Sequence, residues 1–225
     1  MQIPIHLFGV AAAFLTLFAT SATIFRFRKI QAEYTRKFVH IGTGLLTLSF
    51  PFLLDSFAEV ALLCGGFMLL LAASLRWNLL PSINRVERKT HGSLSYPLAV
   101  ILCYGAMEQF GGEGFGALLW FYLPMLVLAL ADPAAAFAGK GPKTTRFRVG
   151  EGEKSLEGSL AFALVTGLVV LICAPLIAAN GMSFALLLLS ITTTTTLAEA
   201  YTPNGLDNLT IPGTVLVNLL IFNLL

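Results

Sequence analysis

Apolar residues form long runs without charged side chains, and these runs recur along nearly the whole chain. Each run is about 17–23 residues long, the length of helix that crosses a hydrocarbon core of ~30 Å. The pattern therefore predicts an all-α polytopic membrane protein with about eight transmembrane helices, in a single domain that covers residues 1–225. The predicted spans lie at roughly 3–25, 37–54, 57–75, 94–110, 116–138, 159–179, 183–200 and 207–225.

The lysines and arginines are confined to three of the predicted loops. They are Arg26, Arg28, Lys29, Arg36 and Lys37 in the first loop, Arg76, Arg85, Arg88 and Lys89 in the third, and Lys140, Lys143, Arg146, Arg148 and Lys154 in the fifth. Loops rich in Lys and Arg stay on the cytoplasmic side of a membrane. We therefore expect the odd-numbered loops to face the cytoplasm and both termini to lie outside.

The composition agrees with a membrane protein and excludes several other classes. Hydrophobic residues make up 56% of the chain and charged residues only 12%, whereas an average soluble domain has about 25% charged residues. The net charge of +2 is not concentrated in a basic domain face, which disfavours nucleic-acid binding. Cys64, Cys103 and Cys173 lie in separate apolar runs, which disfavours a disulfide framework or a zinc site.

Candidate chemistry gathers at the face predicted to be cytoplasmic. Helices that begin there present free N–H groups, and such helix N-termini bind anions, above all phosphate. Asp132 lies within an apolar run, where an ionisable residue is costly and indicates a functional site. Glu199 and Asp207 flank the seventh loop, and Mg²⁺ prefers one or two carboxylates together with substrate phosphates. These residues predict a site for a metal-bound polyphosphate.

Two further segments fit this site. Gly139, Lys140 and Gly141 follow the aspartate, and glycines allow close backbone approach to an anion while lysine supplies a charge. The spacing is not that of a P-loop. Pro133 is expected to interrupt the helix and free carbonyl groups.

The sixth predicted helix opens on Lys154, and Ser155 or Ser159 is expected to cap it. Glu157 is a candidate for holding a cation, and His40 shares a helix face with Arg36. Each of these features also has a plain structural interpretation: a paired aspartate, a basic membrane-flanking loop or an ordinary capped helix.

Four short motifs, in order along the chain, resemble those of the membrane lipid-alcohol kinases, a family that includes phytol kinase, dolichol kinase and the CTP-dependent diacylglycerol kinase. They are Arg36-Lys37-Phe-Val-His40-Ile-Gly42-Thr-Gly44, Asp132-Pro-Ala-Ala-Ala-Phe-Ala-Gly139-Lys140, Lys154-Ser155-Leu-Glu157-Gly158-Ser159, and Glu199 followed by Asp207-Asn208-Leu209-Thr210-Ile-Pro212. Two positions depart from the family's pattern: Ala131 stands where glycine is common, and Leu206 where a second acid is common.

The resemblance implies a CTP-dependent kinase that transfers the γ-phosphoryl group to the hydroxyl of a membrane lipid, either a phytol or polyprenol type of alcohol or diacylglycerol, with Mg²⁺. It implies an active site on the cytoplasmic face of a prokaryotic plasma membrane. The catalytic residues would be Asp132, Lys154 and Glu157, and the metal ligands Asp132, Glu199 and Asp207. The nucleotide-binding residues would be Arg36, Lys37, His40, Gly139, Lys140, Gly141, Ser155, Gly158, Ser159 and Asn208.

Two other functions remain open. A CTP:phosphatidate cytidylyltransferase also joins CTP to a membrane lipid, but the His-Gly-Gly and Asp-Arg pairs of that family are absent from this sequence. A small transporter would place ion sites near the bilayer midplane and often carries inverted repeats. Here the polar residues gather at one face and no repeat is visible, which makes the transporter the weaker alternative.

Overall fold

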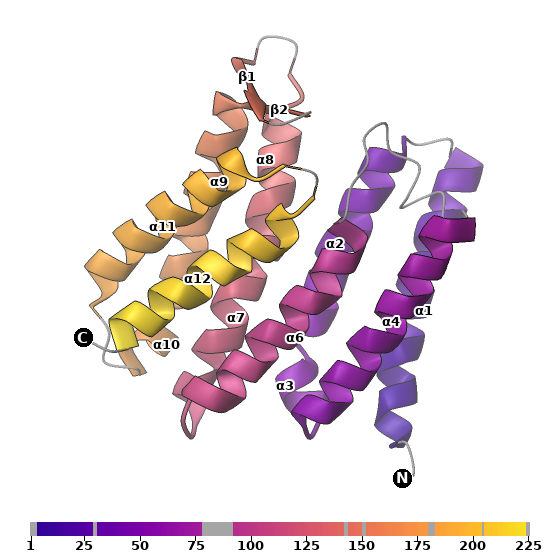
Figure 1. Cartoon of the computed structure of the whole chain (residues 1–225), viewed down its shortest axis with the longest axis horizontal. Helices are drawn as coiled ribbons and strands as arrows, with labels where there is room; N and C mark the ends of the chain where they lie inside the picture. Colours follow the sequence, from indigo (N-terminus) through magenta and orange to yellow (C-terminus); the bar gives the residue numbers. More distant parts are fainter. Residues whose placement is uncertain are drawn as a thin grey trace.

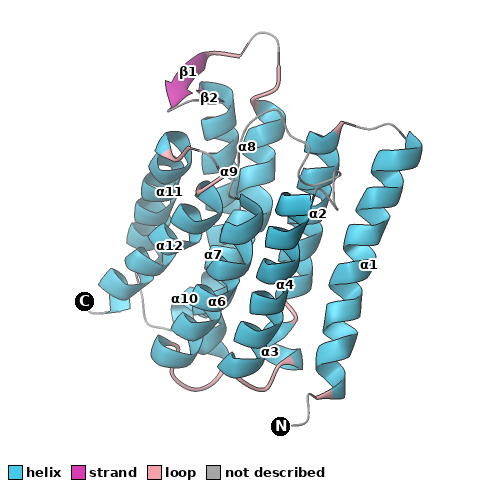
Figure 2. Ribbon diagram, turned by 45° about the vertical axis from the view of Figure 1, so that its right-hand side comes forward, coloured by secondary structure: helices cyan, strands magenta, loops and turns pink. Residues whose placement is uncertain are grey.

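The computed structural model describes residues 4–28, 31–77, 92–141, 144–149, 152–179, 183–203 and 205–223. Helices packed side by side form a bundle, and a small β-hairpin projects from one end of it (Figure 1, Figure 2). The helices of the first half are α1 (Ile5–Arg28), α2 (Ala32–Thr47), α3 (Phe50–Leu53), α4 (Phe57–Trp77) and α6 (Gly92–Phe110). Those of the second half are η1 (Phe115–Leu118), α7 (Leu119–Leu126), η2 (Val127–Ala131), α8 (Asp132–Ala138), α9 (Leu156–Ile172), α10 (Ala174–Ala179), α11 (Phe184–Tyr201) and α12 (Asp207–Asn223).

All eight predicted spans contain helix, but only some of these helices meet the requirements for crossing a membrane. Within the described ranges, four are long and apolar enough: Ile5–Arg28, Phe57–Trp77, Phe115–Ala138 and Phe184–Tyr201. The second predicted span is divided between α2 and α3, and the sixth between α9 and α10. The protein is thus a helical protein with four candidate membrane spans in its described part, while eight spans and outward termini stay predictions.

Five of the 14 basic residues that predict the orientation lie outside the described ranges. They are Lys29, Arg85, Arg88, Lys89 and Lys143. The described basic residues of the first and fifth predicted loops lie toward the end of the bundle that carries the hairpin, and the first turn of α1 and the last turn of α12 lie toward the opposite end (Figure 2).

The central helix of the bundle is α7, which packs against α2, α6, α9 and α12. Trp120, Phe121 and Met125 are completely buried. A helix that is apolar on every side must be enclosed by other helices, and this uniform apolarity accounts for the position of α7. By contrast, α1 and α4 carry exposed apolar side chains such as Phe8 and Leu69, as expected for helices that face lipid.

The helix changes its winding immediately before Asp132. A π-helical turn, Val127–Ala131, joins α7 to α8, and Pro133 stands in the first turn of α8. In a π-helix the carbonyl of Leu128 would pair with the N–H of Pro133, which proline lacks. His40 Nε2 fills this place and donates to the Leu128 carbonyl at 2.9 Å. Pro133 therefore does not break the helix, contrary to expectation, because the helix continues from the π-turn into α8. It does free a backbone carbonyl, as expected, and this is the carbonyl of Leu128.

The fold is all-α as predicted, with a small β-hairpin that was not predicted. Strand β1 (Arg146–Val149) pairs antiparallel with β2 (Gly152–Ser155), with Arg146 opposite Ser155. Its strands are short and rich in charge, so that in the sequence they are indistinguishable from a basic loop. The hairpin matters for the site because β2 ends at Ser155, which begins α9.

Candidate active site

A polar cavity of about 660 Å³ lies where the hairpin meets the bundle. It is lined by the start of α2, by α8, by both strands, by the start of α9, by the last turn of α11 and by the first residue of α12. Its charged lining residues are Glu33, Lys37, Asp132, Lys140, Arg146, Glu153, Lys154, Glu199 and Asp207. A cavity with acids and bases on every wall suits a ligand that carries both negative charge and a bound cation.

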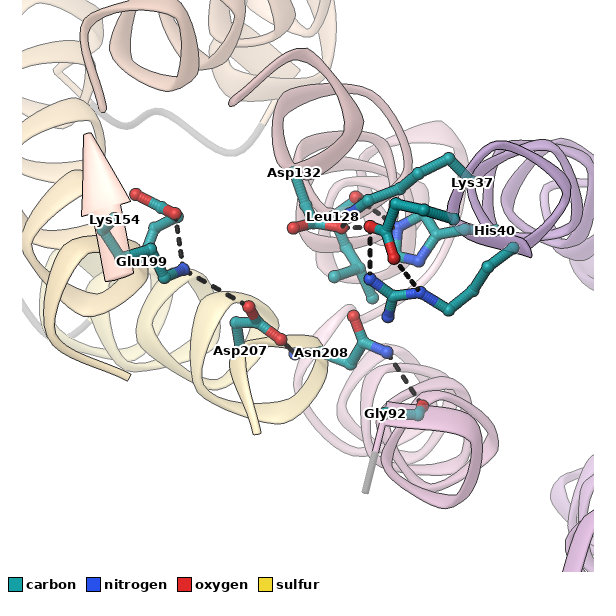
Figure 3. A network of polar contacts seen from close by, with 11 residues as sticks. Lys37, His40, Gly92, Leu128, Asp132, Lys154, Glu199, Asp207 and Asn208 are labelled. Atoms are coloured by element: carbon teal, nitrogen blue, oxygen red, sulfur yellow. Dashed lines mark hydrogen bonds and ion pairs between the residues drawn. The ribbon is translucent and has the colours of Figure 1, made fainter. Parts of the chain in front are cut away.

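One side of this cavity is formed by a buried ion pair between α2 and α8 (Figure 3). Lys37 Nζ donates to Asp132 Oδ2 at 2.6 Å, and both side chains are less than a tenth exposed. His40 Nε2 lies 3.5 Å from the same carboxylate oxygen. Because its Nε2–H is already donated to the Leu128 carbonyl, His40 is a neighbour of the carboxylate that cannot accept a proton at that nitrogen.

The other side is formed by Lys154 of β2 and two carboxylates (Figure 3). Lys154 Nζ donates to Glu199 Oε1 at 2.6 Å and to Asp207 Oδ2 at 3.4 Å. Burial alone would lower the pKa of Lys154, but the neighbouring carboxylates of Asp207 and Glu199 raise it above its ordinary value. The amine therefore stays protonated. The hydroxyl of Ser159 also donates to Glu199, at 3.3 Å.

The start of α9 supplies N–H groups at the edge of the cavity. Ser155 is the N-cap, and its Oγ accepts from the Gly158 N–H at 3.1 Å, which confirms that this serine caps the helix. Two glycines allow α8 and α9 to approach closely here. A Cβ on Gly139 would lie 2.7 Å from Ser155 Oγ, and one on Gly158 would lie 2.9 Å from the Ala135 carbonyl oxygen. Close packing of α8 against α9 thus explains why Gly139 and Gly158 lack a side chain.

Six predicted site residues are not among the lining residues of the polar cavity. The Glu157 carboxylate accepts from the Thr145 backbone N–H, so it positions the segment before the hairpin. Gly141 lies one residue beyond Lys140, and Ser159 reaches the cavity only through Glu199. The other three, Arg36, His40 and Asn208, line a second, apolar cavity.

Two ion pairs at the site were not predicted from the sequence. Glu33 lines the polar cavity and pairs with Arg36 at 2.7 Å. Arg146 and Glu153 form a diagonal ion pair across the hairpin at 3.2 Å and also line the cavity. A charged residue three positions before an arginine is a signal for the first pair. The second depends on strand pairing and had no such signal.

The predicted metal ligands are of the right chemical type, but they do not meet at one point. Asp132, Glu199 and Asp207 supply carboxylate oxygens, which are ligands that Mg²⁺ accepts. Among the described residues, however, these three do not form a group of ligand atoms within 4.8 Å of one another. The ammonium group of Lys154 lies between Glu199 and Asp207.

Fold and cavity together define a polytopic helical membrane protein with a buried acid–base site at one end. The chain is 32% identical over 216 residues to a phytol kinase from Synechocystis sp., and the alignment covers 93% of this chain and 88% of that protein. The chain therefore belongs to the phytol kinase family, a family of membrane lipid-alcohol kinases. No protein-family model matches the chain. No solved structure matches it either.

Proposed function

We propose that this protein transfers the γ-phosphoryl group of CTP to the hydroxyl of a phytol-type membrane alcohol, at the cytoplasmic face of a prokaryotic plasma membrane and with Mg²⁺. The observation that carries the proposal is the meeting of two buried charge clusters in one cavity, Lys37–Asp132 and Lys154–Glu199–Asp207. The family relationship supports the alcohol as acceptor. The motif resemblance supports CTP as donor.

The two lysines and the start of α9 would bind the phosphates. Lys37 and Lys154 are cations that would neutralise phosphate oxygens. The N–H groups after the Ser155 cap would add the partial positive charge of a helix N-terminus. Catalysis of phosphoryl transfer consists mostly of positioning and charge neutralisation, and these groups supply both.

Glu199 and Asp207 would hold Mg²⁺ against the phosphates, which leaves Asp132 to accept the hydroxyl proton. The bound cation would supply further neutralisation of the developing charge. Glu157 enters this proposal as a positioning residue, because its carboxylate is bonded to the backbone of Thr145 rather than facing the cavity.

In the transfer step, the alcohol oxygen forms a bond to the γ-phosphorus while the bridging bond to the β-phosphate breaks. CDP leaves with the electron pair of that bond, and the hydroxyl proton passes to Asp132. The Lys37 ion pair weakens Asp132 as a base, but a loose transition state needs little removal of the proton before the bond to the leaving group breaks.

The test is product analysis with the purified full-length protein in lipid nanodiscs. With γ-labelled CTP, Mg²⁺ and phytol, we expect the label in a phosphorylated lipid and an equal amount of CDP. Release of pyrophosphate would instead indicate a cytidylyltransferase. Loss of phosphate from CTP that is independent of any alcohol would contradict the proposal, and a strong preference for ATP would overturn its donor.

A further inference from the structure

A second cavity, of about 90 Å³, lies beside the polar one and is mostly apolar. Its walls come from α1, α2, α4 and α6, through side chains such as Phe14, Cys64, Phe67 and Val100. Two of these helices, α1 and α4, also carry exposed apolar side chains on the surface of the bundle. The cavity therefore lies between the polar site and the lipid-facing side of the molecule.

The two cavities share their dividing wall. On α2, Lys37 lines the polar cavity and its neighbour Arg36 lines the apolar one. On α12, Asp207 lines the polar cavity and its neighbour Asn208 lines the apolar one. His40 lines the apolar cavity and lies 3.5 Å from Asp132 of the polar one. A group at this wall has contact with both spaces.

The apolar cavity has hydrogen-bonding capacity that no described residue uses. Tyr96 is 6% exposed and lines the cavity, and its hydroxyl has no hydrogen-bond partner within the described ranges. Ser93 Oγ, one turn earlier on α6, is also buried and without a partner in that part of the chain. The ring of Tyr96 packs edge-on against His40, with ring centroids 4.9 Å apart. A buried hydroxyl without a partner costs about 1–3 kcal/mol, and a ligand hydroxyl would remove that cost.

The volume limits what the cavity holds. At about 10–15 Å³ for each water-sized group, a cavity of about 90 Å³ has room for about six to nine non-hydrogen atoms. The hydroxyl and the first branched five-carbon unit of an isoprenoid alcohol have about that many. The remainder of the tail would leave between the helices toward lipid.

The geometry points to the apolar cavity as the subsite for the hydroxyl end of the acceptor, with the Tyr96 hydroxyl orienting the acceptor oxygen toward the polar cavity. This inference rests on the proposed function and adds the place and the recognition of the acceptor. Tyr96 donates a hydrogen bond to the alcohol oxygen, which retains a lone pair for attack on the γ-phosphorus. The bonds formed and broken, the leaving CDP and the proton to Asp132 are those of the transfer step above.

Replacing Tyr96 by phenylalanine removes the hydroxyl and leaves the ring against His40. We expect Tyr96→Phe to lower kcat/KM for the alcohol about tenfold, the effect of one lost hydrogen bond, with the KM for CTP unchanged. Tyr104→Phe is the matched control, because Tyr104 lies on the same helix, is buried, and donates to the Leu54 carbonyl rather than lining either cavity. Equal kcat/KM values for the two variants would overturn the role of Tyr96.

A cavity-filling pair tests the subsite itself. Cys64 lines the apolar cavity, whereas Cys173 is equally a free and buried cysteine that lines neither cavity. We expect Cys64→Met to raise the KM for a branched isoprenoid alcohol at least about fivefold relative to Cys173→Met. Both variants overpack the protein interior, but only Cys64→Met takes space from the ligand in the apolar cavity. The same KM in both variants would contradict the subsite.

Photo-crosslinking separates this inference from the proposed function, because it needs no turnover. A diazirine-bearing isoprenoid alcohol, bound to the wild-type protein without nucleotide, should label peptides of α4 and α6. Label confined to other helices would overturn the subsite even if the kinase assay succeeds. Label on α4 and α6, together with no alcohol phosphorylation, would uphold the subsite and reject the proposed reaction.

Discussion

Ionic clusters occur at both ends of the bundle, and they differ in their exposure to solvent. At the end away from the hairpin, His6 Nε2 lies 3.1 Å from Glu59 and 4.0 Å from Asp55. The Asp55 side chain there is 85% exposed, whereas that of Asp132 is 9% exposed. The distances are similar, so that the difference lies in solvation.

The difference in exposure matters because burying charged groups carries a desolvation cost that exposed ion pairs do not have. An exposed ion pair contributes little to stability, and its sequence is free to vary. A buried charge requires a partner, and a buried ion pair is often no more stabilising than apolar packing of the same volume. The protein nonetheless keeps Lys37, Asp132, Lys154, Glu199 and Asp207 at the walls of one cavity, which favours function over stability as their reason.

The largest expected effect is at Asp132. Asp132→Asn keeps the shape of the side chain but removes its charge, and we expect kcat to fall at least about 1,000-fold, or about 4 kcal/mol in transition-state stabilisation. Expression and membrane insertion should stay near those of the wild type. Asp55→Asn, at the exposed cluster, should stay within about twofold. Retention of most activity by Asp132→Asn would remove this residue from the site.

The next effect is on the requirement for the metal. Glu199→Gln removes one of the carboxylates that border the Lys154 ammonium group while Asp207 remains. We expect the Mg²⁺ concentration for half-maximal activity to rise about tenfold, since one anionic ligand is lost. The measurement is a Mg²⁺ titration of the kinase rate at fixed CTP. An unchanged midpoint, with Glu113→Gln as the exposed control, would contradict a role for Glu199 in holding the metal.

A smaller effect is expected where α8 and α9 cross. A methyl group on Gly158 would lie 2.9 Å from the Ala135 carbonyl oxygen, whereas one on Gly167 of the same helix would meet nothing within 4 Å. Gly158→Ala should therefore cost about 1–3 kcal/mol in stability through overpacking, while Gly167→Ala should be neutral or stabilise by up to about 1 kcal/mol. Thermal unfolding in detergent compares them. Equal unfolding temperatures would show that the helices separate freely at this crossing.

The smallest effect concerns the helix cap beside the polar cavity. Ser155 Oγ caps α9, whereas Ser183 precedes α11 without a side-chain cap hydrogen bond. Loss of the cap in Ser155→Ala should cost about 1 kcal/mol, and Ser183→Ala should change the unfolding free energy by only a few tenths. If both variants unfold alike, the cap has no energetic role and the α9 N-terminus is a weaker anion site than proposed.

The sequence was most informative where burial and periodicity act locally. Long apolar runs predicted a helix in every expected range, because backbone hydrogen bonds must be satisfied within each segment in lipid. Asp132 was singled out because a charge in such a run is costly. The Ser155 cap was predicted because a serine at a helix start is a local signal.

What the sequence did not predict depends on contacts between distant segments. The Lys37–Asp132 pair joins residues 95 positions apart, and nothing local indicates that partner. The π-turn before Asp132 arises from Pro133 and His40 acting together. The hairpin depends on pairing between two short charged strands, and so does the bond that the Glu157 carboxylate accepts from the Thr145 backbone N–H before the hairpin.

The most direct test of the central claim is the affinity for Mg²⁺–CTP of two variants, one from each side of the polar cavity. If both charge clusters hold the same nucleotide, Lys37→Met and Lys154→Met should each raise its Kd at least about tenfold, the loss of one charge-assisted contact. Arg76→Met, which removes an exposed charge, should leave the Kd within about twofold. A Kd that rises in one lysine variant and is unchanged in the other would contradict a polyphosphate held between the two clusters.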